Sequence, residues 1–396
     1  MPSSSSTPPP DGEPHKQSGS SWDHTTEWLR GDGPEVDVVL SSRVRLARNI
    51  VGFPFVHRCS REDRLAIMGM VRRRLEAMPD QESGGWMAMA AAAPFAWVPL
   101  HELSAIERTL LVERHLISSN LAKGFSLHGA KSTKPPEGAA AAPRAVAHTH
   151  EDRQAIMVNE EDHLRIQVIG AGLSLDEAAH AAEKIDDYLE AGLDFAYSPR
   201  FGYLTACPTN VGTGIRCSVM LHLPALRMSG ELEKVKRAAH DMMLAVRGFY
   251  GEGSEALADL YQVSNQTTLG KTERVIRHEL MGEIIPRVIE YERAERRKMI
   301  EKRPRVLEDQ VWRALGVLRN ARLLSTEEAL SALSTVRLGA VMGLLPGVDP
   351  KLINHLLLIA QPAHLQAVAG RTLDPERAKA ARADVMRARL GTEPRA

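Results

Sequence analysis

The sequence of 396 residues has few cysteines, no net charge and no long apolar run. Its three cysteines, Cys59, Cys207 and Cys217, are too few for a disulfide framework and are typical of a protein in the reducing cytoplasm. Fifty basic residues balance fifty acidic ones, so the composition indicates neither nucleic acid nor a membrane surface as a partner. The longest apolar run, residues 87–100, is too short to cross a bilayer and contains two prolines.

The N-terminus also lacks an apolar core. Its first ten residues, MPSSSSTPPP, do not have the pattern of a signal peptide. Residues 1–30 are rich in Ser, Pro and Gly and predict a disordered tail, because they carry little to bury. We therefore expect ordered structure to begin near Val36 and the protein to be cytoplasmic.

The remaining pattern of apolar residues predicts a mixed sheet with helices, followed by helices alone from about Arg305. The predicted strands are residues 36–50, 154–170, two within 201–223, 243–251 and 257–269. The predicted helices are residues 60–78, 174–190 and 271–303, the last bent at Pro286, and residues 129–150 are expected to be a mobile connection. Helix starts are predicted at Ser60 with Asp63, Ser174 with Glu177, Ser325 with Glu328, Asp349-Pro350 and Asp374-Pro375.

Residues 264–273, SNQTTLGKTE, end like a phosphate-binding P-loop, G-x-x-x-x-G-K-[ST]. The first glycine of that motif should stand at position 265, which is Asn265. A charged helix is predicted to follow, with no apolar strand ending in an acidic metal ligand. A P-loop ATPase is therefore a poor interpretation, and Lys271-Thr272 is expected to begin the helix.

Charged residues cluster in NEEDHLR, residues 159–165, between apolar flanks. In an extended chain Glu161, His163 and Arg165 would share one face, which would present a carboxylate beside a guanidinium. The alternative is a solvated edge or hairpin. A pair of histidines in AHTHED, His148 and His150, lacks a second cluster and is a weak candidate for a metal site.

Arginines recur beside predicted strands and polar turns. Arg43 and Arg45 lie in SSRVRLARN, Arg216 ends CPTNVGTGIR, and Arg247 begins RGFYGE. Each alone is best explained by a surface ion pair. Together with Arg165 they can surround a triphosphate, because phosphoryl transfer mainly requires alignment of the reactants and compensation of charge.

These motifs resemble a known family. SSRVRLARN, LVERHLIS, NEEDHLR, CPTNVGT and RGFYGEGSEA occur here in the order seen in phosphagen (guanidino) kinases, the ATP:guanido phosphotransferases. The chain looks most like their bacterial branch, the McsB-type protein arginine kinases, over about Val36–Leu390. This resemblance implies an α+β fold: a catalytic domain at residues 31–300 with a mainly antiparallel sheet flanked by helices, and a small all-helical domain at residues 301–396 for dimerisation or regulation.

The resemblance also implies an ATP site. The phosphates would be held by Arg43, Arg45, Arg165, Arg216 and Arg247, with His115 near the nucleotide. The nucleotide-contacting segments would be Ser41, Ser42, Arg43, Val44 and Arg45; Arg216, Cys217, Ser218, Val219 and Met220; and Arg247, Gly248, Phe249, Tyr250, Gly251 and Glu252. Mg would bind phosphate oxygens and water, and no protein metal ligand is implied.

Glu161 and Glu252 are similar to the family's carboxylate pair, and Cys207 to its active-site cysteine. A protonated guanidinium is no nucleophile, so two carboxylates can clamp it and one can accept its proton as the N–P bond forms. We expect Glu161 to be the base. Cys207 beside a guanidinium can be a thiolate, or it can be simply a small residue.

The sequence departs from the family at two places. Phe249 stands where relatives carry a small polar residue. The branch also resembles a phosphoarginine reader through an R-D-x-x-R-A motif, which corresponds here to residues 378–383. Only Arg382-Ala383 remains of it, so an allosteric phosphoarginine site is degenerate.

The expected function is an ATP-dependent kinase that phosphorylates arginine side chains in proteins. A homodimer, an activator protein and Clp-type protease machinery in a stress response are implied by the resemblance. One alternative is a free-arginine or guanidino-metabolite kinase. Such kinases resemble one another in having a helical domain before the first arginine motif. Here that motif begins at Ser41, which leaves no room for such a domain. The other is a non-catalytic adaptor, which the intact Glu161, Glu252 and five arginines disfavour.

Overall fold

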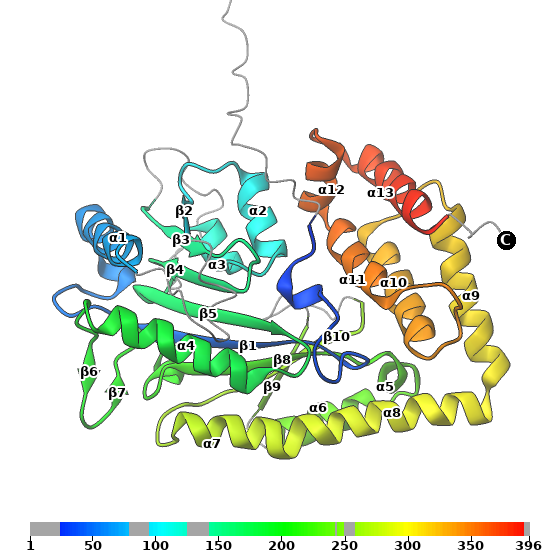
Figure 1. Ribbon diagram of the computed structural model, residues 1–396, viewed down its shortest axis with the longest axis horizontal. Coiled ribbons are helices and arrows are strands. Elements are labelled where there is room, and N and C mark those ends of the chain that lie inside the picture. The colour runs from blue at the N-terminus through cyan, green and yellow to red at the C-terminus, as the bar shows by residue number, and fades with distance from the viewer. Residues whose placement is uncertain (1–23, 79–94, 125–141, 242–243, 249–257, 392–396) are drawn as a thin grey trace, which may run out of the picture.

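The computed structural model describes residues 24–78, 95–124, 142–241, 244–248 and 258–391. Its main sheet has eight strands in the order β2-β3-β4-β5-β1-β8-β10-β9 (Figure 1). These strands are β1 Val39–Arg48, β2 Ala96–Pro99, β3 Ala145–His148, β4 Gln154–Val158, β5 Leu164–Ala171, β8 Ile215–His222, β9 Leu244–Arg247 and β10 Leu260–Asn265. All of their pairings are antiparallel, and β6 Tyr197–Ser198 with β7 Gly202–Tyr203 form a separate small hairpin.

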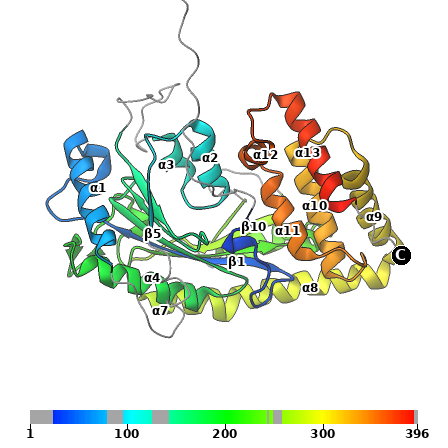
Figure 2. The ribbon, with the colours of Figure 1, turned by 45° about the horizontal axis from the view of Figure 1, so that its top comes forward.

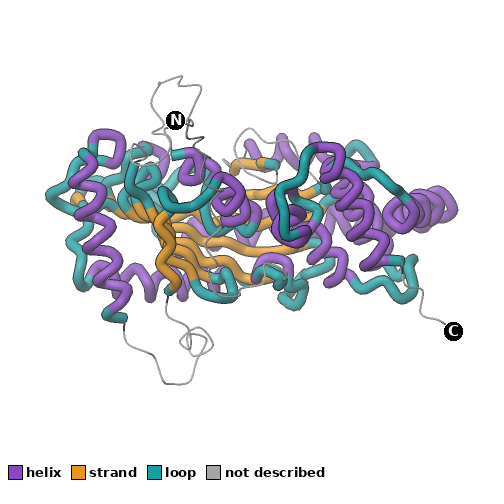
Figure 3. The backbone as a smooth tube through the Cα atoms, turned by 90° about the horizontal axis from the view of Figure 1, so that it is seen from above, coloured by secondary structure: helices purple, strands orange, loops and turns teal. Residues whose placement is uncertain are grey.

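Helices cover both faces of the sheet and gather beyond one end of it (Figures 2 and 3). In the catalytic part they are α1 Arg61–Glu76, α2 Ala105–Glu113, α3 Ser119–Lys123, α4 Leu175–Glu190, α5 Pro224–Met228, α6 Leu232–Asp241, α7 Glu273–His278 and α8 Ile285–Lys302. The terminal group is α9 Pro304–Asn320, α10 Thr326–Val341, α11 Pro350–Ile359, α12 Pro362–Ala369 and α13 Pro375–Leu390. The α+β class, the antiparallel sheet and the helical C-terminal region are thereby confirmed.

The largest core lies between one face of the sheet and helices α4 and α8. Alternate residues of β1, Val44 and Leu46, point into it and are almost fully buried. Helix α4 packs on β1 and β5 with a face that includes Ala178 and Ile185. Since strand residues alternate between faces, the arginines between these apolar positions point the other way.

A second core joins the C-terminal helices to the sheet and to the N-terminal segment. It includes Trp28 and Leu29 of the 3-10 helix η1 (Glu27–Leu29), which are 1% and 0% exposed. The Asn354 amide of α11 donates a hydrogen bond to the Leu29 carbonyl oxygen at 3.3 Å. The expectation that order begins near Val36 is therefore wrong, because this short helix is buried against α11. Residues 1–23 lie outside the described residues.

A third, smaller core lies under α2 and α3. Leu111 of α2 and Leu121 of α3 pack there with Val146 of β3 and Met157 of β4. The expected mobile connection is therefore wrong for residues 145–148, which form β3 between β2 and β4. Residues 129–141 lie outside the described residues.

Most of the predicted helix starts are confirmed. Ser60 and Asp63 form a reciprocal capping box, and Ser325, Asp349 and Asp374 each accept a backbone N–H of their helix. Ser174 is an exception: it is the N-cap residue of α4, but its hydroxyl donates to the Ala171 carbonyl oxygen at 3.0 Å instead of capping.

The segment predicted as one bent helix is interrupted by a π-helical turn. Helix α7 is followed by a π-helix, Glu279–Ile284, and Pro286 then stands in the first turn of α8. Thr272 is the N-cap of α7, its side chain accepting from the Val275 N–H, and Lys271 pairs with Glu279 at 2.6 Å. The Gly-Lys-Thr sequence therefore begins a helix, as predicted.

Candidate active site

The sheet register places five widely separated arginines on one face. Arg45 stands opposite Arg216, and Ala47 opposite Arg165. Gln262 stands opposite both Met220 and Arg247. Directly opposed residues share a face, as do residues two apart, so Arg43, Arg45, Arg165, Arg216 and Arg247 all belong to the face opposite the largest core. We call this side the arginine face.

Arg43 and Arg45 on the arginine face are partly buried, and their positive charge is poorly compensated. Among the described residues, no carboxylate lies within ion-pair distance of Arg43 or Arg45, and the buried Nε atom of each has no hydrogen-bond partner. Burial and the charge of Arg216 lower the pKa of Arg43 to about 10. Burial together with Arg43 and Arg216 lowers the pKa of Arg45 well below its usual range. A polyanion would relieve both the desolvation and the mutual repulsion.

His115 lies close to these arginines. It follows α2 with a left-handed backbone (φ 62°), and its ring centroid is 4.6 Å from that of Trp28. The Gln167 amide donates to the His115 carbonyl oxygen at 2.7 Å. Burial and the charges of Arg43 and Arg45 lower the pKa of His115 to about 3, so its imidazole is neutral near pH 7.

A small cavity opens beside Arg43 and His115. Its lining consists of Trp28, Ser41, Arg43, His115, Ile169, Ser218, Met220 and Gln262. Its volume of about 10 Å³ has room for one water molecule, so a larger ligand could enter only if the lining side chains moved apart. The Gln262 amide donates to the Ser218 hydroxyl at 2.8 Å, which orients both polar groups.

Several side chains in the expected nucleotide segments face elsewhere. Val44, Cys217 and Val219 lie in the largest core, because strand alternation turns every second residue away from the arginine face. The Ser42 hydroxyl is buried and donates to the Gly172 carbonyl oxygen at 2.9 Å. These four side chains therefore do not contact a nucleotide that lies on the arginine face.

The acidic segment NEEDHLR forms a tight connection between β4 and β5 rather than a continuous strand. Asn159 has a left-handed backbone (φ 61°), and its N–H donates to the His163 carbonyl oxygen at 2.9 Å. The prediction of one strand over residues 154–170 is wrong. The segment forms a hairpin, but the hairpin is not solvated as the alternative supposed, because Asn159, Glu160 and Asp162 are buried. His163 is a structural residue: its Nδ1 accepts from the Ile50 N–H at 2.9 Å, and its Nε2 donates to the Pro54 carbonyl oxygen.

The turn gathers three carboxylates around Arg165. Glu160 and Glu161 both form ion pairs with Arg165, and Asp162 lies 3.9 Å from it. Burial raises the pKa of Glu161, with Arg165 opposing the shift and Asp162 and Glu160 adding to it. Burial alone would lower the pKa of Arg165, but the three carboxylates raise it. The expected pairing of a carboxylate with a guanidinium is thus present.

Asp162 connects this turn to the Cys207 segment. Its Oδ1 accepts from the Ala206 N–H at 2.7 Å and from the Asn49 amide at 2.8 Å. Cys207, the next residue, is partly exposed, with its sulfur 3.0 Å from the Thr209 hydroxyl. The turn at residues 159–163, which we call the carboxylate turn, and the loop that contains Cys207 are therefore held together, although they are separated by about forty positions in the sequence.

The other two cysteines are distinguished by their surroundings. Cys217 is buried in the largest core, which raises its pKa to about 12. Burial also raises the pKa of Cys59, whose sulfur donates to the Pro54 carbonyl oxygen. Both are therefore poor thiolates, as expected for small packing residues.

The last segment of the expected site begins at the end of β9. Arg247 and Gly248 are described, but Phe249, Tyr250, Gly251 and Glu252 lie outside the described residues. The second carboxylate of the expected guanidinium clamp therefore stays a prediction.

Sequence reasoning missed several residues that shape the site. Glu160 and Asp162 belong to NEEDHLR but were given no role. Their closeness to Arg165 in the sequence could have indicated that they pair with it. Asn49 was quoted at the end of SSRVRLARN without a role. Trp28 had no signal, because it stands in a segment whose composition predicts disorder.

Two minor candidates also find structural explanations. The Arg382 guanidinium is 3% exposed and donates to the carbonyl oxygens of Ala360 and Leu324, each at 2.8 Å, while Ala383 is fully buried. His148 lies 3.5 Å from Asp152, and His150 stacks on His24. The described residues contain no cluster of three or more metal-ligating groups.

Within the described ranges, no helix is long and apolar enough to cross a membrane.

Comparison with known families agrees with this architecture. Residues 87–295 match the model of the ATP:guanido phosphotransferase C-terminal catalytic domain, and residues 304–396 match the protein-arginine kinase McsB C-terminal domain. The chain belongs to the ATP:guanido phosphotransferase family.

The chain is similar over almost its whole length to proteins named protein-arginine kinase. One from Pelotomaculum thermopropionicum is 41% identical over 93% of this chain and 97% of its own. One from Moorella thermoacetica is 42% identical over 92% of this chain and 97% of its own.

Solved structures of guanidino kinases share the fold. The duplicated taurocyamine kinase from Schistosoma mansoni, with bound transition-state analogue components, has a TM-score of 0.53 and 27% identity. That similarity covers 66% of this chain and 34% of the solved chain. A lombricine kinase has a TM-score of 0.52 and 25% identity, covering 67% and 68% of the two chains.

Proposed function

We propose that this protein transfers the γ-phosphate of ATP to arginine side chains of other proteins. The single observation that supports this most strongly is the arginine face itself, where partly buried guanidinium groups lie next to the turn that carries Glu160, Glu161 and Asp162. The first arrangement suits a triphosphate and the second suits a guanidinium substrate. The names of the relatives and the match of the C-terminal helices favour a protein over a metabolite as the acceptor.

The nucleotide would lie along the arginine face. Arg43, Arg45, Arg165, Arg216 and Arg247 would hold its phosphates. The base would lie near Trp28 and His115, where the small cavity would have to widen to receive it. A neutral His115 can donate or accept one hydrogen bond without adding to the positive charge. Mg would be bound by phosphate oxygens and water.

The acceptor guanidinium would lie between Glu161 and the predicted Glu252. As the nitrogen forms its bond to the γ-phosphorus, the bond to the β–γ bridging oxygen breaks and ADP leaves. The proton released from the guanidinium passes to Glu161, whose raised pKa makes it a stronger base than an ordinary glutamate. In the structure Glu161 is bound by Arg165, so phosphates that draw Arg165 toward them would free the carboxylate.

The wider roles are also proposals. We propose a catalytic domain at residues 31–300 and a regulatory helical domain at residues 301–396, and a homodimer formed through the latter. A cytoplasmic location, an activator protein and a role with a Clp-type protease in stress response follow from the family resemblance. Residues 378–383 have lost most of the motif for reading phosphoarginine, and Arg382 is committed to internal hydrogen bonds.

One experiment tests the function. The protein is incubated with γ-labelled ATP and Mg, with either an unfolded arginine-containing protein or free arginine. We expect label on the protein that is lost in acid and survives mild base, because the product is a phosphoramidate. Label on free arginine alone would support the metabolite kinase, acid-stable label would indicate a hydroxyl acceptor, and absence of label with both acceptors would support the adaptor.

A further inference from the structure

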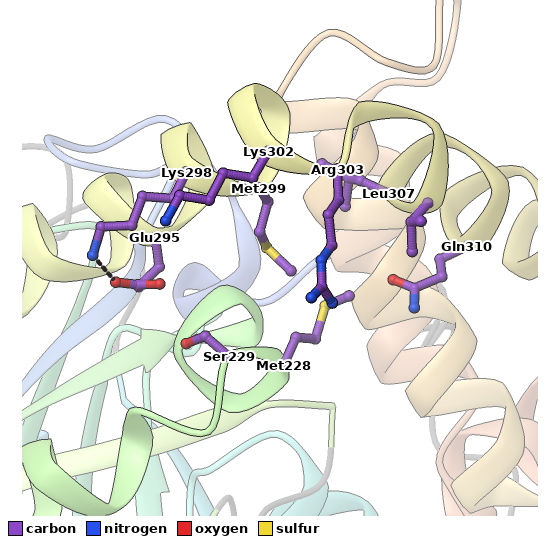
Figure 4. Close-up of a pocket in the computed structure, with 10 residues that line it drawn as sticks. Met228, Ser229, Glu295, Lys298, Met299, Lys302, Arg303, Leu307 and Gln310 are labelled. Carbon is purple, nitrogen blue, oxygen red and sulfur yellow. Dashed lines mark hydrogen bonds and ion pairs between the residues drawn. The ribbon is translucent and has the colours of Figure 1, made fainter.

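A groove lies where α5, α8, α9 and α10 meet. One hollow is lined by residues of α5, α8 and α9 (Figure 4). A second is lined by residues of α5, α9 and α10. The two hollows are adjacent, since Met228 and Gln310 line both, and we call them together the α9 groove. None of its described lining residues belongs to the candidate active site.

Helix α9 turns two different faces to its surroundings. Leu307, Val311 and Leu318 are buried in the second core, as expected of an amphipathic helix. Val306 and Val317, which line the groove, are 51% and 39% exposed. Together with Met228, Met299 and Ala314 they give the groove an apolar lining that is open to solvent, which is the kind of surface that binds partners.

The floor of the groove is adaptable. Met228 of α5 and Met299 of α8 lie on opposite sides of the first hollow, and the side chains of both point into it (Figure 4). Methionine side chains are flexible and polarisable, and they accommodate different apolar partners. From Val306 to Val317 the groove follows about 16 Å of helix. This length matches about five residues of an extended chain.

The rim of the groove is basic in a protein without net charge. Five lining residues are basic and two are acidic; the basic ones are Arg227, Lys298, Lys302, Arg303 and Arg313. Lys298 pairs with Glu295 at 2.5 Å, Arg313 with Asp309, and Arg227 with the buried Asp259. Lys302 and Arg303 are exposed and have no carboxylate within ion-pair distance among the described residues. Figure 4 shows the Arg303 guanidinium directed toward Met228.

Charge distinguishes the occupants that this surface can have. A second copy seated on a two-fold axis would bring the same basic rim onto itself, which like charges disfavour. A nucleic acid would use the positive charge but not the apolar floor, because the groove has no exposed aromatic side chain among its lining residues for base stacking. An extended protein segment that alternates acidic and apolar residues satisfies both features, since its side chains point alternately to the floor and the rim.

We propose that the α9 groove docks an extended segment of a partner or substrate protein in which acidic and apolar residues alternate. The docking would hold a protein on the enzyme at a place separate from the site of chemistry and raise its local concentration there. The consequence for catalysis rests on the proposed protein-kinase function, whereas binding to the groove does not.

Binding is measured first, by fluorescence anisotropy of a labelled eight-residue peptide that alternates glutamate and leucine and contains no arginine. The double variant Lys302→Glu with Arg303→Glu should weaken binding by about tenfold, because two attractions become repulsions. Val306→Asp should also weaken binding of the peptide, because it places a charge in the apolar lining of the groove. Arg305→Glu is the matched control: this exposed residue of the same helix turn does not line the groove, and binding should be unchanged.

Kinase assays on the full-length protein then compare a short arginine peptide with the same peptide carrying the acidic and apolar extension. The double variant should raise KM about tenfold for the extended peptide and leave KM for the short one and both kcat values unchanged. Absence of labelling of either peptide by the wild type would contradict the kinase function and leave the binding result intact.

Three results would overturn the docking proposal. The first is wild-type affinity of the alternating peptide for the double variant. The second is equal binding of an all-glutamate peptide or a single-stranded oligonucleotide, which would show that charge alone decides. The third is a dimer in light scattering that dissociates on the Lys302 and Arg303 substitutions, which would assign the groove to a second copy.

Discussion

Along β1, Val44 and Leu46 point into the core under the sheet, while Arg43 and Arg45 between them point to the opposite face. Burying one apolar side chain such as Leu46 contributes about 1.5–3 kcal/mol to folding. On the other face, burial and mutual repulsion lower the pKa of Arg43 and Arg45, which means that these charges destabilise the folded protein. The same strand thus supplies stability on one side and stored positive charge on the other.

The comparison explains why a phosphate site can be built without a glycine-rich loop. The core side supplies the stability that allows the arginine face to keep its charges close together. Charges that are already in place need no reorganisation when a triphosphate binds.

The largest effect is expected on the arginine face, at the carboxylate turn. Glu161→Gln should reduce phosphoryl transfer by about 10²–10⁴-fold, because the proton acceptor is lost. The rise in Tm on adding ATP, measured by thermal shift, should be unchanged, since the arginines remain. Glu62→Gln, at an exposed position of α1, is the control for a carboxylate away from the site.

The same residue should set the acid side of the pH profile. Glu161 must be ionised to act as the base, and burial raises its pKa. As the pH is lowered, the wild-type rate should therefore begin to fall at a higher pH than it would if the base had the pKa of an ordinary glutamate. A limb at the ordinary position would contradict the assignment of Glu161 as base.

A core substitution should separate stability from activity. Leu46→Ala should lower the free energy of unfolding by about 2–5 kcal/mol, because it leaves a cavity under the sheet. Chemical denaturation measures this change, and kcat measured below the transition should stay near that of the wild type. A large loss of kcat in the folded variant would show that the two faces are not independent.

Substitution of Arg45, which precedes Leu46 in β1, should weaken ATP binding but stabilise the protein. Arg45→Met should weaken ATP binding by about 10- to 100-fold, since a hydrogen bond to a charged group contributes about 1.5–3 kcal/mol. Without ATP, the variant should unfold at a higher temperature than the wild type, because a partly buried charge that is repelled by its neighbours is removed. Arg72→Met, at an exposed site on α1, should change neither quantity. Destabilisation by Arg45→Met would mean that its charge is compensated.

The smallest effect concerns His115. Its pKa is lowered to about 3 by burial and by Arg43 and Arg45, while in the unfolded chain it titrates near the ordinary value of about 6.5. Below that value the unfolded state binds the additional proton, so stability is fully present above about pH 6.5 and is lost progressively down to about pH 3. His115→Gln should make the loss of stability less steep over this range, as measured by denaturation at several pH values.

Parts of the fold were predictable because their causes are local. The capping serine at Ser60 and the Asp-Pro starts at Asp349 and Asp374 act within one helical turn, and all were confirmed. The prediction that Lys271-Thr272 begins a helix succeeded for the same reason. The tight turn at Asn159 was only an alternative to one strand, because an apolar run on each side of charged residues fits either one strand or a hairpin.

The remaining features depend on contacts between distant segments. Trp28 belongs to a segment of disordered composition and is ordered only by the helices of the second core. Asp162 meets Ala206 because two loops converge at one end of the sheet. The groove along α9 exists because α5 and α10 stop short of covering Val306 and Val317.

The sequence by itself determined the alternation in β1 and β8, and with it that arginines and apolar residues fall on opposite faces, because a strand repeats every two residues. It also carried the motifs that placed the chain in its family. Only the tertiary structure decided that Arg43, Arg45, Arg165 and Arg216 share one face, because that depends on the order and register of strands far apart in the chain. Long-range pairing is set by the packing of the whole core, which no local pattern specifies.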